Sequence, residues 1–250
     1  MSEIFSRTER LIGAAAVKKL NCSRVAVFGI GGVGGYIAEA LARAGVGAID
    51  LIDSDKVSLS NINRQIYALN STVGKLKTEV AKERILDINP DCTVKTYDLF
   101  YTPETANLFD FKTYDYIADA VDTVTAKMSL VEKAEENGVR IISAMGAGNK
   151  LDPTGFSVAD IYQTSGCPLA RVMRTLCKKR GIKSLKVVYS AEKSVTPIAD
   201  SVEDCDHADE SAVNSAAGKT GNRIPASISF VPPVVGFIMA GEIIKDIIGK

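Results

Sequence analysis

The sequence RVAVFGIGGVG, at residues 24–34, decides the fold. Its apolar first half is typical of a strand that is buried on both faces of a sheet. Gly29, Gly31 and Gly34 follow the GxGxxG spacing directly after that strand, and apolar residues at helical spacing come next. Such a turn lets bare backbone approach a phosphate at the positive end of a helix. For the glycines alone, a tight turn without a ligand remains the alternative interpretation.

A carboxylate strengthens the nucleotide interpretation. The next apolar strand ends at Asp53, nineteen residues after Gly34. An acidic residue at this place in a βαβ unit accepts the hydroxyls of a ribose. Asp53 and the glycine turn together predict a nucleotide site.

Cationic and amide side chains follow Asp53 closely. Asp55, Asn61 and Arg64 lie in the segment DSDKVSLSNINRQ, and Lys77 comes soon after it. A dinucleotide needs little positive charge here, whereas a triphosphate needs more, and a nearby carboxylate can hold Mg²⁺. We therefore expect ATP, with Arg64 and Lys77 neutralising its β- and γ-phosphates. Surface ion pairs remain the alternative role for the two cations.

NAD is the other nucleotide that the glycine turn admits. Hydride transfer usually calls on a proton-transferring residue, and the sole histidine, His207, falls in an acidic stretch where we expect no buried site. Lysine or tyrosine could replace histidine, so this observation favours ATP without excluding NAD.

Strands and helices alternate through the first 145 residues. The strand-like runs after Asp53 are at residues 93–96, 114–122 and 139–146. A helical pattern at 80–88 precedes the first run, and another at 125–137 lies between the last two. In the second half, strand-like runs at 155–164 and 184–192 flank a basic helix that begins near Pro168, and a short run at 226–231 precedes a closing helix. We expect an α/β fold with a Rossmann-like, doubly wound, mainly parallel sheet, extended by antiparallel strands in the C-terminal half.

The chain length suits one domain over residues 1–250, with a nucleotide-binding half at 1–150 and a substrate-side half at 151–250. Residues 196–225 show no apolar period and contain six acidic residues. A gap of this length is either a mobile functional loop or plain disorder, and the sequence leaves both open.

Composition limits the class of protein. The 30 basic and 30 acidic residues cancel, so a nucleic acid must be held by a local basic patch. The five cysteines form no CxxC pair, which argues against a disulfide framework or a zinc ribbon and favours a reducing cytoplasm. The apolar stretch 231–248 is interrupted by prolines and charged residues, so we expect a helix that covers the sheet and no membrane span.

Five motifs, in this order and spacing, resemble the ATP-binding core of the ubiquitin-activating-type (ThiF/MoeB-like) adenylating enzymes: GIGGVGGY, LIDSDKV, SLSNINRQ, VGKLK and DAVDTVTAK. Further segments resemble the tRNA threonylcarbamoyladenosine dehydratase branch of that superfamily: RLIG, INPDC, GAGNKLDPT and SISFVPPVVGFIMAGEIIKD. The likeness therefore spans nearly the whole chain.

The resemblance implies roles for individual residues. It implies a nucleotide bound by the glycine turn, the second strand and the loops beyond: Gly29, Gly31, Gly32, Gly34, Asp53, Asp55, Asn61, Arg64, Lys77 and Asp122. Asp122 matches a magnesium-associated aspartate, and Asp119 is the weaker candidate. Arg10 resembles an arginine that reaches from one subunit into its partner's ATP site, with Arg7 as the alternative, so the resemblance also implies a homodimer. The implied catalytic residues are Arg10, Arg64, Lys77 and Asp122.

The implied reaction is an ATP-dependent dehydration. The threonyl carboxylate of threonylcarbamoyladenosine in tRNA is adenylated and then cyclised, and AMP is released. The alternative is adenylation of the C-terminal carboxylate of a sulfur-carrier protein or peptide, and the resemblance leaves a sulfur-transfer protein open as a partner. We expect no DNA partner.

Two observations favour tRNA over a carrier protein. Seven basic residues and no acid occur in 171–186, which predicts a phosphate-binding face, although a solvated helix face is the alternative. Carrier-protein activators often have two zinc-binding CxxC pairs, and this chain has none.

The cysteines give little evidence about the reaction. Cys205, in the acidic stretch, could accept an acyl group, but neighbouring acids should raise its pKa. We expect Cys22, Cys92, Cys167 and Cys177 to be packed residues. A non-catalytic nucleotide-binding scaffold and an NAD-dependent reductase remain as rival functions.

Overall fold

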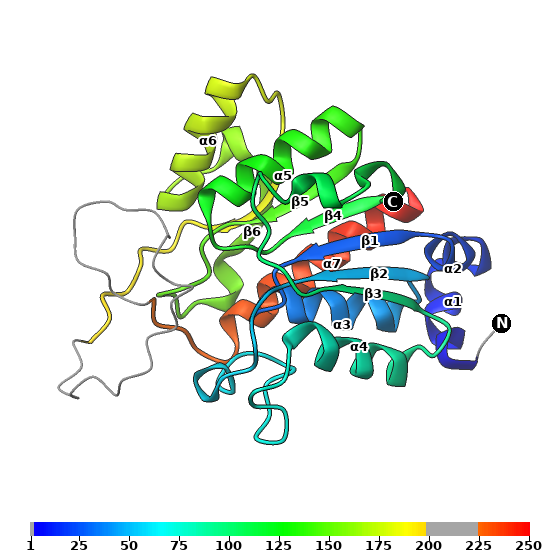
Figure 1. The fold of residues 1–250 in the computed structure, drawn as a ribbon. Helices are drawn as coiled ribbons and strands as arrows, with labels where there is room; N and C mark the ends of the chain where they lie inside the picture. The colour runs from blue at the N-terminus through cyan, green and yellow to red at the C-terminus, as the bar shows by residue number, and fades with distance from the viewer. Residues whose placement is uncertain (1–2, 199–224) are drawn as a thin grey trace.

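The computed structural model of the chain describes residues 3–198 and 225–250. Within them the strands are β1 Arg24–Phe28, β2 Ala48–Ile52, β3 Thr93–Tyr97, β4 Tyr116–Asp119, β5 Arg140–Ala144, β6 Phe156–Asp160 and β7 Lys186–Ser190. The α-helices are α1 Ser6–Ile12, α2 Ala14–Asn21, α3 Gly34–Ala44, α4 Lys77–Ile88, α5 Val124–Asn137, α6 Pro168–Arg180 and α7 Val231–Ile248. Figure 1 shows the sheet at the centre with helices above and below it.

The strands form one sheet in the order β3-β2-β1-β4-β5-β7-β6. All neighbouring pairs are parallel except β6 with β7, which is antiparallel. The chain reverses its direction across the sheet between β1 and β4, and ligands of open α/β sheets bind at the carboxyl ends of the strands at such a point. The prediction of a mainly parallel, doubly wound sheet with an antiparallel extension is confirmed.

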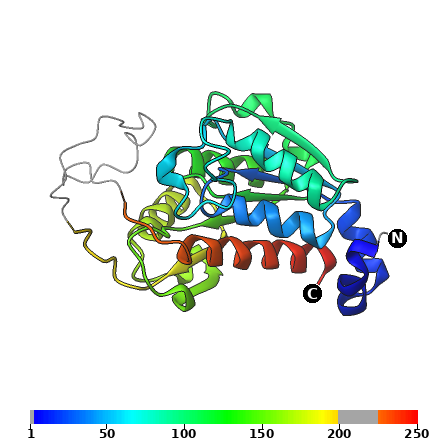
Figure 2. The same cartoon turned by 90° about the horizontal axis from the view of Figure 1, so that it is seen from below.

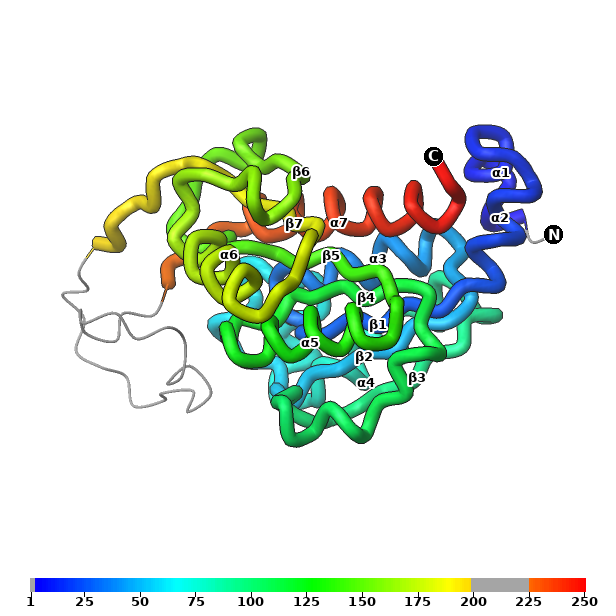
Figure 3. Tube along the Cα trace, turned by 90° about the horizontal axis from the view of Figure 1, so that it is seen from above, coloured from blue at the N-terminus to red at the C-terminus, as the bar shows by residue number. Residues whose placement is uncertain are grey.

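Helices cover both faces of the sheet. Seen from below, α4, α3 and α7 lie side by side across one face (Figure 2). Seen from above, α5 and α6 lie over the other (Figure 3). Their apolar sides fill separate cores, one of which joins β1 and β2 to α3, α4 and α7, while another joins α5 to a group of aromatic side chains around Phe28. Buried apolar area on both faces stabilises the parallel strands.

The closing helix differs from its predicted form at its start. Residues 225–230 form no strand, and α7 begins at Val231, so the expectation of an extended run at 226–231 is wrong. Pro232 and Pro233 lie in the first turn of α7, where a missing N–H costs no intrahelical hydrogen bond. Among the described residues, no helix combines the length and the apolar character that crossing a membrane requires.

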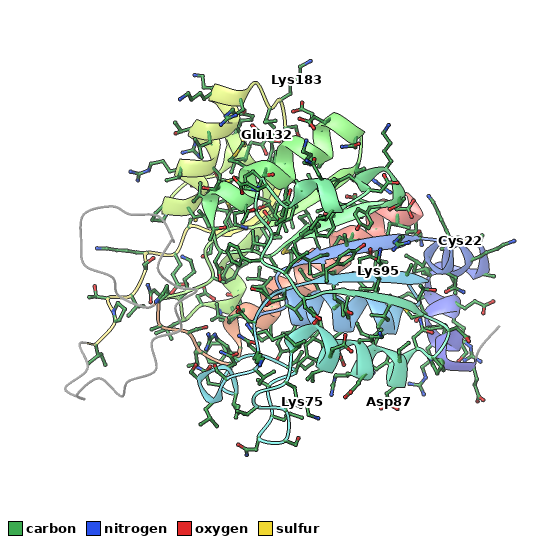
Figure 4. The ribbon with its side chains drawn as sticks, in the orientation of Figure 1. Cys22, Lys75, Asp87, Lys95, Glu132 and Lys183 are labelled. Carbon is green, nitrogen blue, oxygen red and sulfur yellow. The ribbon has the colours of Figure 1, made fainter. Side chains whose placement is uncertain are left out.

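Cys22 is exposed, which contradicts the prediction that it is packed (Figure 4). It caps the C-terminal end of α2, whose buried face carries Val17 and Leu20. Because Cys22 lies off that face, its side chain meets solvent. Cys92, Cys167 and Cys177 are buried as predicted, whereas Cys205 and His207 lie outside the described residues.

Candidate nucleotide-binding site

Two glycines of the turn after β1 are required by the backbone. Gly29 has a φ of +86°, and a Cβ there would lie 2.6 Å from the carbonyl oxygen of Ala120. At Gly34, a Cβ would lie 1.7 Å from the carbonyl oxygen of Gly29. These contacts bring β1, the start of α3 and the loop after β4 together at the point where the sheet reverses direction. Gly29 and Gly34 therefore shape the turn.

Gly31 has a different role, because the space above it is open. A Cβ at Gly31 would meet nothing nearer than the Gln65 side-chain nitrogen, 3.9 Å away. Among the described residues, no group accepts a hydrogen bond from the backbone N–H of Gly31, Gly32 or Val33. These amides precede the first turn of α3, where the helix dipole favours negative charge. The turn is thus built to receive an anionic group such as a phosphate.

Asp53 is fixed beside the turn by two backbone amides. Its Oδ2 accepts from Ile30 N at 2.6 Å, and its Oδ1 accepts from Asp55 N at 2.8 Å. Burial raises the pKa of Asp53 above its ordinary value, although the charge of Lys77 and the two N–H groups act in the opposite direction. The carboxylate is held in one orientation at the end of β2, next to the glycine turn.

The loop between β2 and α4 is closed at its base by Asp55 and Lys77. Lys77 N donates to the Asp55 carbonyl at 3.0 Å, and Lys77 Nζ lies 2.6 Å from Asp55 Oδ2. The Lys77 side chain is buried, whereas that of Asp55 is 40% exposed. The structure thus places a buried cation at the first residue of α4, with an accessible anion as its partner.

Arg64 and Asn61 lie in this loop with defined partners. Arg64 Nη1 donates to the Ser60 carbonyl and to Asn63 Oδ1, both at 2.8 Å. Its side chain also approaches the turn, since a Cβ at Gly32 would lie 3.6 Å from Arg64 Cγ. The buried Asn61 accepts from Ser58 N at 3.2 Å in a capping box. Asn61 therefore orders the loop that presents Arg64.

Asp119 is engaged in a fully buried ion pair. Its carboxylate lies 3.1 Å from Lys127 Nζ, and it also accepts from the Ser143 hydroxyl and from Val121 N. Lys127 further donates to the Ala144 carbonyl at 2.7 Å. Removing one partner of such a pair leaves an uncompensated charge. Asp119 therefore orders the loop that follows β4.

Asp122, in the same loop, is exposed to solvent. Desolvation by the surrounding protein nevertheless raises its pKa above the ordinary value. The positive charges of Lys127, Lys77 and Arg64 act in the opposite direction, because they favour the ionised carboxylate. Only nearby charges exert such an effect. The loop that carries Asp122 also touches the glycine turn, since a Cβ at Gly29 would lie 3.1 Å from Val121 N. Asp122 thus belongs to a cluster of charged side chains at this end of the sheet, although they come from three separate segments.

Arg10 is not part of this cluster. It is exposed on α1, and α1 lies at the end of the sheet opposite the glycine turn (Figure 1). The prediction for Arg10 concerns a second copy of the chain and stays a prediction. Residues 199–224, which make up most of the predicted loop 196–225, lie outside the described residues.

The buried role of Lys127 is a feature of the site that was not predicted from the sequence. The available signal was a lysine on the apolar face of a predicted helix, in line with Leu130, Val131 and Ala134. A lysine on such a face needs a buried anionic partner, and the partner is supplied by Asp119 at the end of β4.

Comparison with known proteins agrees with this geometry. The tRNA threonylcarbamoyladenosine dehydratase of Bacillus subtilis (strain 168) is 44% identical over 245 residues, which cover 98% of this chain and 94% of the relative. The adenylyltransferase and sulfurtransferase UBA4 of Saccharomyces cerevisiae (strain YJM789) is 39% identical over 139 residues, which cover 55% of this chain and 31% of that protein.

A solved structure matches the whole fold. The crystal structure of the E. coli tRNA N6-threonylcarbamoyladenosine dehydratase in complex with ATP superposes with a TM-score of 0.84 at 34% identity, over 99% of this chain and 94% of that one. The profile of the ThiF family matches residues 5–250. The chain belongs to the ThiF family.

Proposed function

We propose that this chain is an ATP-dependent tRNA threonylcarbamoyladenosine dehydratase. It adenylates the threonyl carboxylate of threonylcarbamoyladenosine in tRNA and cyclises the product, releasing AMP. The observation that carries the proposal is the 44% identity to a dehydratase over nearly the full length of both chains. The open phosphate cradle at Gly31 supports it, because an adenylating enzyme must bind a triphosphate at such a turn.

The proposed ATP site uses residues that the fold brings together. The free amides of Gly31 and Gly32 receive phosphate oxygens, while Gly29 and Gly34 hold the turn open. Asp53 accepts the ribose hydroxyls, since its orientation is already fixed by Ile30 N and Asp55 N. The phosphates are held by Asn61, Arg64 and Lys77, with Asp55 keeping Lys77 at the base of the loop.

The chemistry follows from charge. A carboxylate oxygen of the substrate attacks the α-phosphorus, the bond to the bridging oxygen of the β-phosphate breaks, and pyrophosphate leaves. Arg64 and Lys77 offset the negative charge that develops on the phosphates. A nitrogen or oxygen of the neighbouring carbamoyl group then attacks the activated acyl carbon and AMP departs, so the net change in the nucleoside is the loss of one water.

Magnesium fits this site as an ion shared with the substrate. Asp122 offers an accessible carboxylate, whereas Asp119 is committed to Lys127. Mg²⁺ in nucleotide sites is commonly held by one or two carboxylates together with phosphates, so we assign Asp122 as its ligand. When bound, the ion supplies further positive charge at the phosphates.

We further propose a homodimer in which Arg10 serves the ATP site of the partner. Arg10 is exposed on α1, far along the sheet from the turn of its own chain (Figure 1). A second copy can supply the same residue if the two chains are related by a two-fold axis. Within each chain we assign nucleotide binding to residues 1–150 and the acceptor side to residues 151–250 of one domain.

The basic segment around α6 is the proposed contact for tRNA phosphates. Three of its seven cations are engaged: Arg174 with Thr164, Arg180 with Glu132, and Lys186 with Asp246 and Glu242. The other four are exposed and have no ion-pair partner within residues 3–198 and 225–250: Arg171, Lys178, Lys179 and Lys183. Lys183 projects beyond the end of α6 in Figure 4. Unpaired cations on one face suit a polyanion.

The test is incubation with α-labelled ATP and either bulk tRNA carrying threonylcarbamoyladenosine or a sulfur-carrier protein. AMP release that depends on the modified tRNA, with a nucleoside lighter by one water, is the expected result. Carrier-dependent exchange of pyrophosphate, without any effect of tRNA, would instead establish the carrier-activating alternative. NADH binding without ATP binding would overturn both.

A further inference from the structure

Asn149, in the loop after β5, joins two segments that are distant in sequence. Its backbone N donates to the Ala226 carbonyl and its side-chain Oδ1 accepts from Ala226 N, both at 2.8 Å. Its carbonyl accepts from Val195 N at 2.8 Å. Asn149 also has a φ of 58°, and it is the only non-glycine residue with a positive φ in the part of the chain that the structure describes. Asparagine adopts this conformation more readily than most residues.

The two bonded segments are the two ends of a long connection. Val195 follows β7, and Ala226 precedes α7, with residues 196–225 between them. The attachment is reinforced nearby, since Lys150 Nζ donates to the Glu192 carbonyl at 2.7 Å and Leu151 N donates to Glu192 Oε1 at 2.9 Å. Bringing together the ends of a long connection has an entropic cost, and these hydrogen bonds offset part of it.

The segment that Asn149 holds also reaches the nucleotide site. Ser227, next to Ala226, accepts from Asn63 Nδ2 through its carbonyl at 3.1 Å. The same Asn63 accepts from the Arg64 guanidinium through Oδ1 at 2.8 Å. Further along, Pro232 lies against the glycine turn, since a Cβ at Gly32 would be 3.1 Å from Pro232 Cβ. A continuous path of hydrogen bonds and covalent bonds therefore leads from Asn149 to Arg64.

We propose that Asn149 is a positioning residue for adenylation. By fixing residues 225–227 it holds Asn63, and Asn63 together with the Ser60 carbonyl fixes the orientation of the Arg64 guanidinium. The proposal rests on the proposed function only in that Arg64 acts on the phosphates. Small displacements of a charged group from the reacting atoms reduce the rate strongly, so a residue that never touches ATP sets the efficiency of Arg64.

Two substitutions separate the side-chain hydrogen bond from the backbone conformation. Asn149→Gly accepts the positive φ but removes the Oδ1 acceptor. Asn149→Asp keeps an acceptor and also tolerates the left-handed region. We expect Asn149→Gly to lower kcat for tRNA-dependent AMP release about tenfold, with little change in the Kd of ATP. Asn149→Asp should retain most of the wild-type kcat.

A double-mutant cycle tests the path itself. Asn63→Ala should lower kcat to a similar degree, and the double variant Asn63→Ala/Asn149→Gly should be no slower than the slower single variant. Multiplicative losses, or an Asn149→Gly variant that only lowers Tm and leaves kcat unchanged, would overturn the proposal.

Hydrogen exchange gives a readout that does not need turnover. In the full chain without ATP, peptides that contain Ala226 and Ser227 should exchange faster in Asn149→Gly than in the wild type or in Asn149→Asp. Unchanged exchange contradicts the role of Asn149 in holding this segment. If wild-type protein releases no AMP with modified tRNA, the proposed function fails, whereas the exchange result still decides whether Asn149 fixes residues 225–227.

Discussion

Lys77 and Asp55 form an ion pair, with 2.6 Å between Nζ and Oδ2, in which the cation is buried and the anion is accessible. A buried ammonium is stable only with a close counter-charge. Asp55 supplies that charge, and a phosphate that arrives beside the glycine turn offers a second one. The pair therefore keeps a positive charge in the site without an unpaired, desolvated cation.

Replacement of Lys77 by alanine should nearly abolish AMP formation. Loss of one preorganised cation at developing negative charge typically reduces the rate about 10²-fold or more. The measurement is tRNA-dependent AMP release under saturating ATP, with circular dichroism to check the fold. Lys75→Ala is the matched control, because Lys75 is exposed in the same loop (Figure 4). If Lys77→Ala and Lys75→Ala lost AMP release to the same extent, the specific role of Lys77 in the reaction would be contradicted.

Substitution of Gly31 should affect ATP binding, whereas substitution of Gly34 should affect the stability of the fold. Gly31→Ala introduces a methyl group into open space, so the free energy of unfolding should change by less than about 1 kcal/mol while ATP binding is lost. Gly34→Ala places Cβ 1.7 Å from the Gly29 carbonyl oxygen and should destabilise the fold by about 3 kcal/mol or more. Chemical denaturation and ATP titration measure both effects. ATP binding by Gly31→Ala at wild-type affinity would exclude a phosphate from this turn.

Mixing two inactive variants should restore activity if Arg10 acts across a dimer. Arg10→Ala and Arg64→Ala each inactivate every site of their own homodimers. After subunit exchange, each heterodimer has one site with both arginines intact, so about a quarter of the wild-type activity should return. A mixture of Arg64→Ala with Lys77→Ala serves as the control. Because Arg64 and Lys77 both act in the site of their own chain, one site of each heterodimer lacks Arg64 and the other lacks Lys77, so no activity should return. If the mixture of Arg10→Ala with Arg64→Ala recovered no activity, the proposal that Arg10 acts in the site of the partner would be contradicted.

The exposed cations of α6 and of the segment that follows it should set the salt dependence of tRNA binding. The triple change Lys178→Ala/Lys179→Ala/Lys183→Ala should reduce the slope of log K against log salt by about one for each phosphate contact that is lost. ATP affinity should stay unchanged. Lys112→Ala removes an exposed lysine elsewhere and serves as control. An unchanged slope in the triple variant would place tRNA on another surface.

Glu39 should make stability depend on pH on the acidic side. Burial alone raises its pKa, but hydrogen bonds from Arg84 and Arg43 outweigh that effect, so the pKa is lowered from 4.5. Its stabilising contribution is therefore fully present above pH 4.5 and is lost as the pH falls through the lower value of the folded protein. Glu39→Gln should cost about 2 kcal/mol at pH 7, and the difference from wild type should shrink on acidification. Urea unfolding at several pH values measures this, and a constant difference would contradict it.

Local patterns were sufficient to predict most of the fold. The apolar run of β1, the glycine spacing and Asp53 lie within one βαβ unit, so their arrangement follows from short-range geometry. The antiparallel extension was predictable from the loss of strand and helix alternation after β5. The run at 226–231 was misinterpreted because its apolar residues are compatible with a strand, whereas the structure uses Val231 to begin α7.

Side-chain pairing between distant segments was beyond prediction from one sequence. Lys127 meets Asp119 and Ser143 only because β4 and β5 are neighbours in the sheet. Asn149 likewise acquires its partners from the return of the chain before α7. Such contacts depend on three-dimensional packing that leaves no periodic signal, which is why motifs predict candidate site residues but not the residues that support them.

The position of α7 has a consequence for biosynthesis. Val235 and Met239 fill the same core as Val25 and Val27 of β1, although they are translated near the end of this sequence. The apolar side chains of β1 thus emerge from the ribosome well before the helix that shields them. The contacts between α7 and β1 can therefore form only after nearly all of these residues have been synthesised, so this part of the core is completed late.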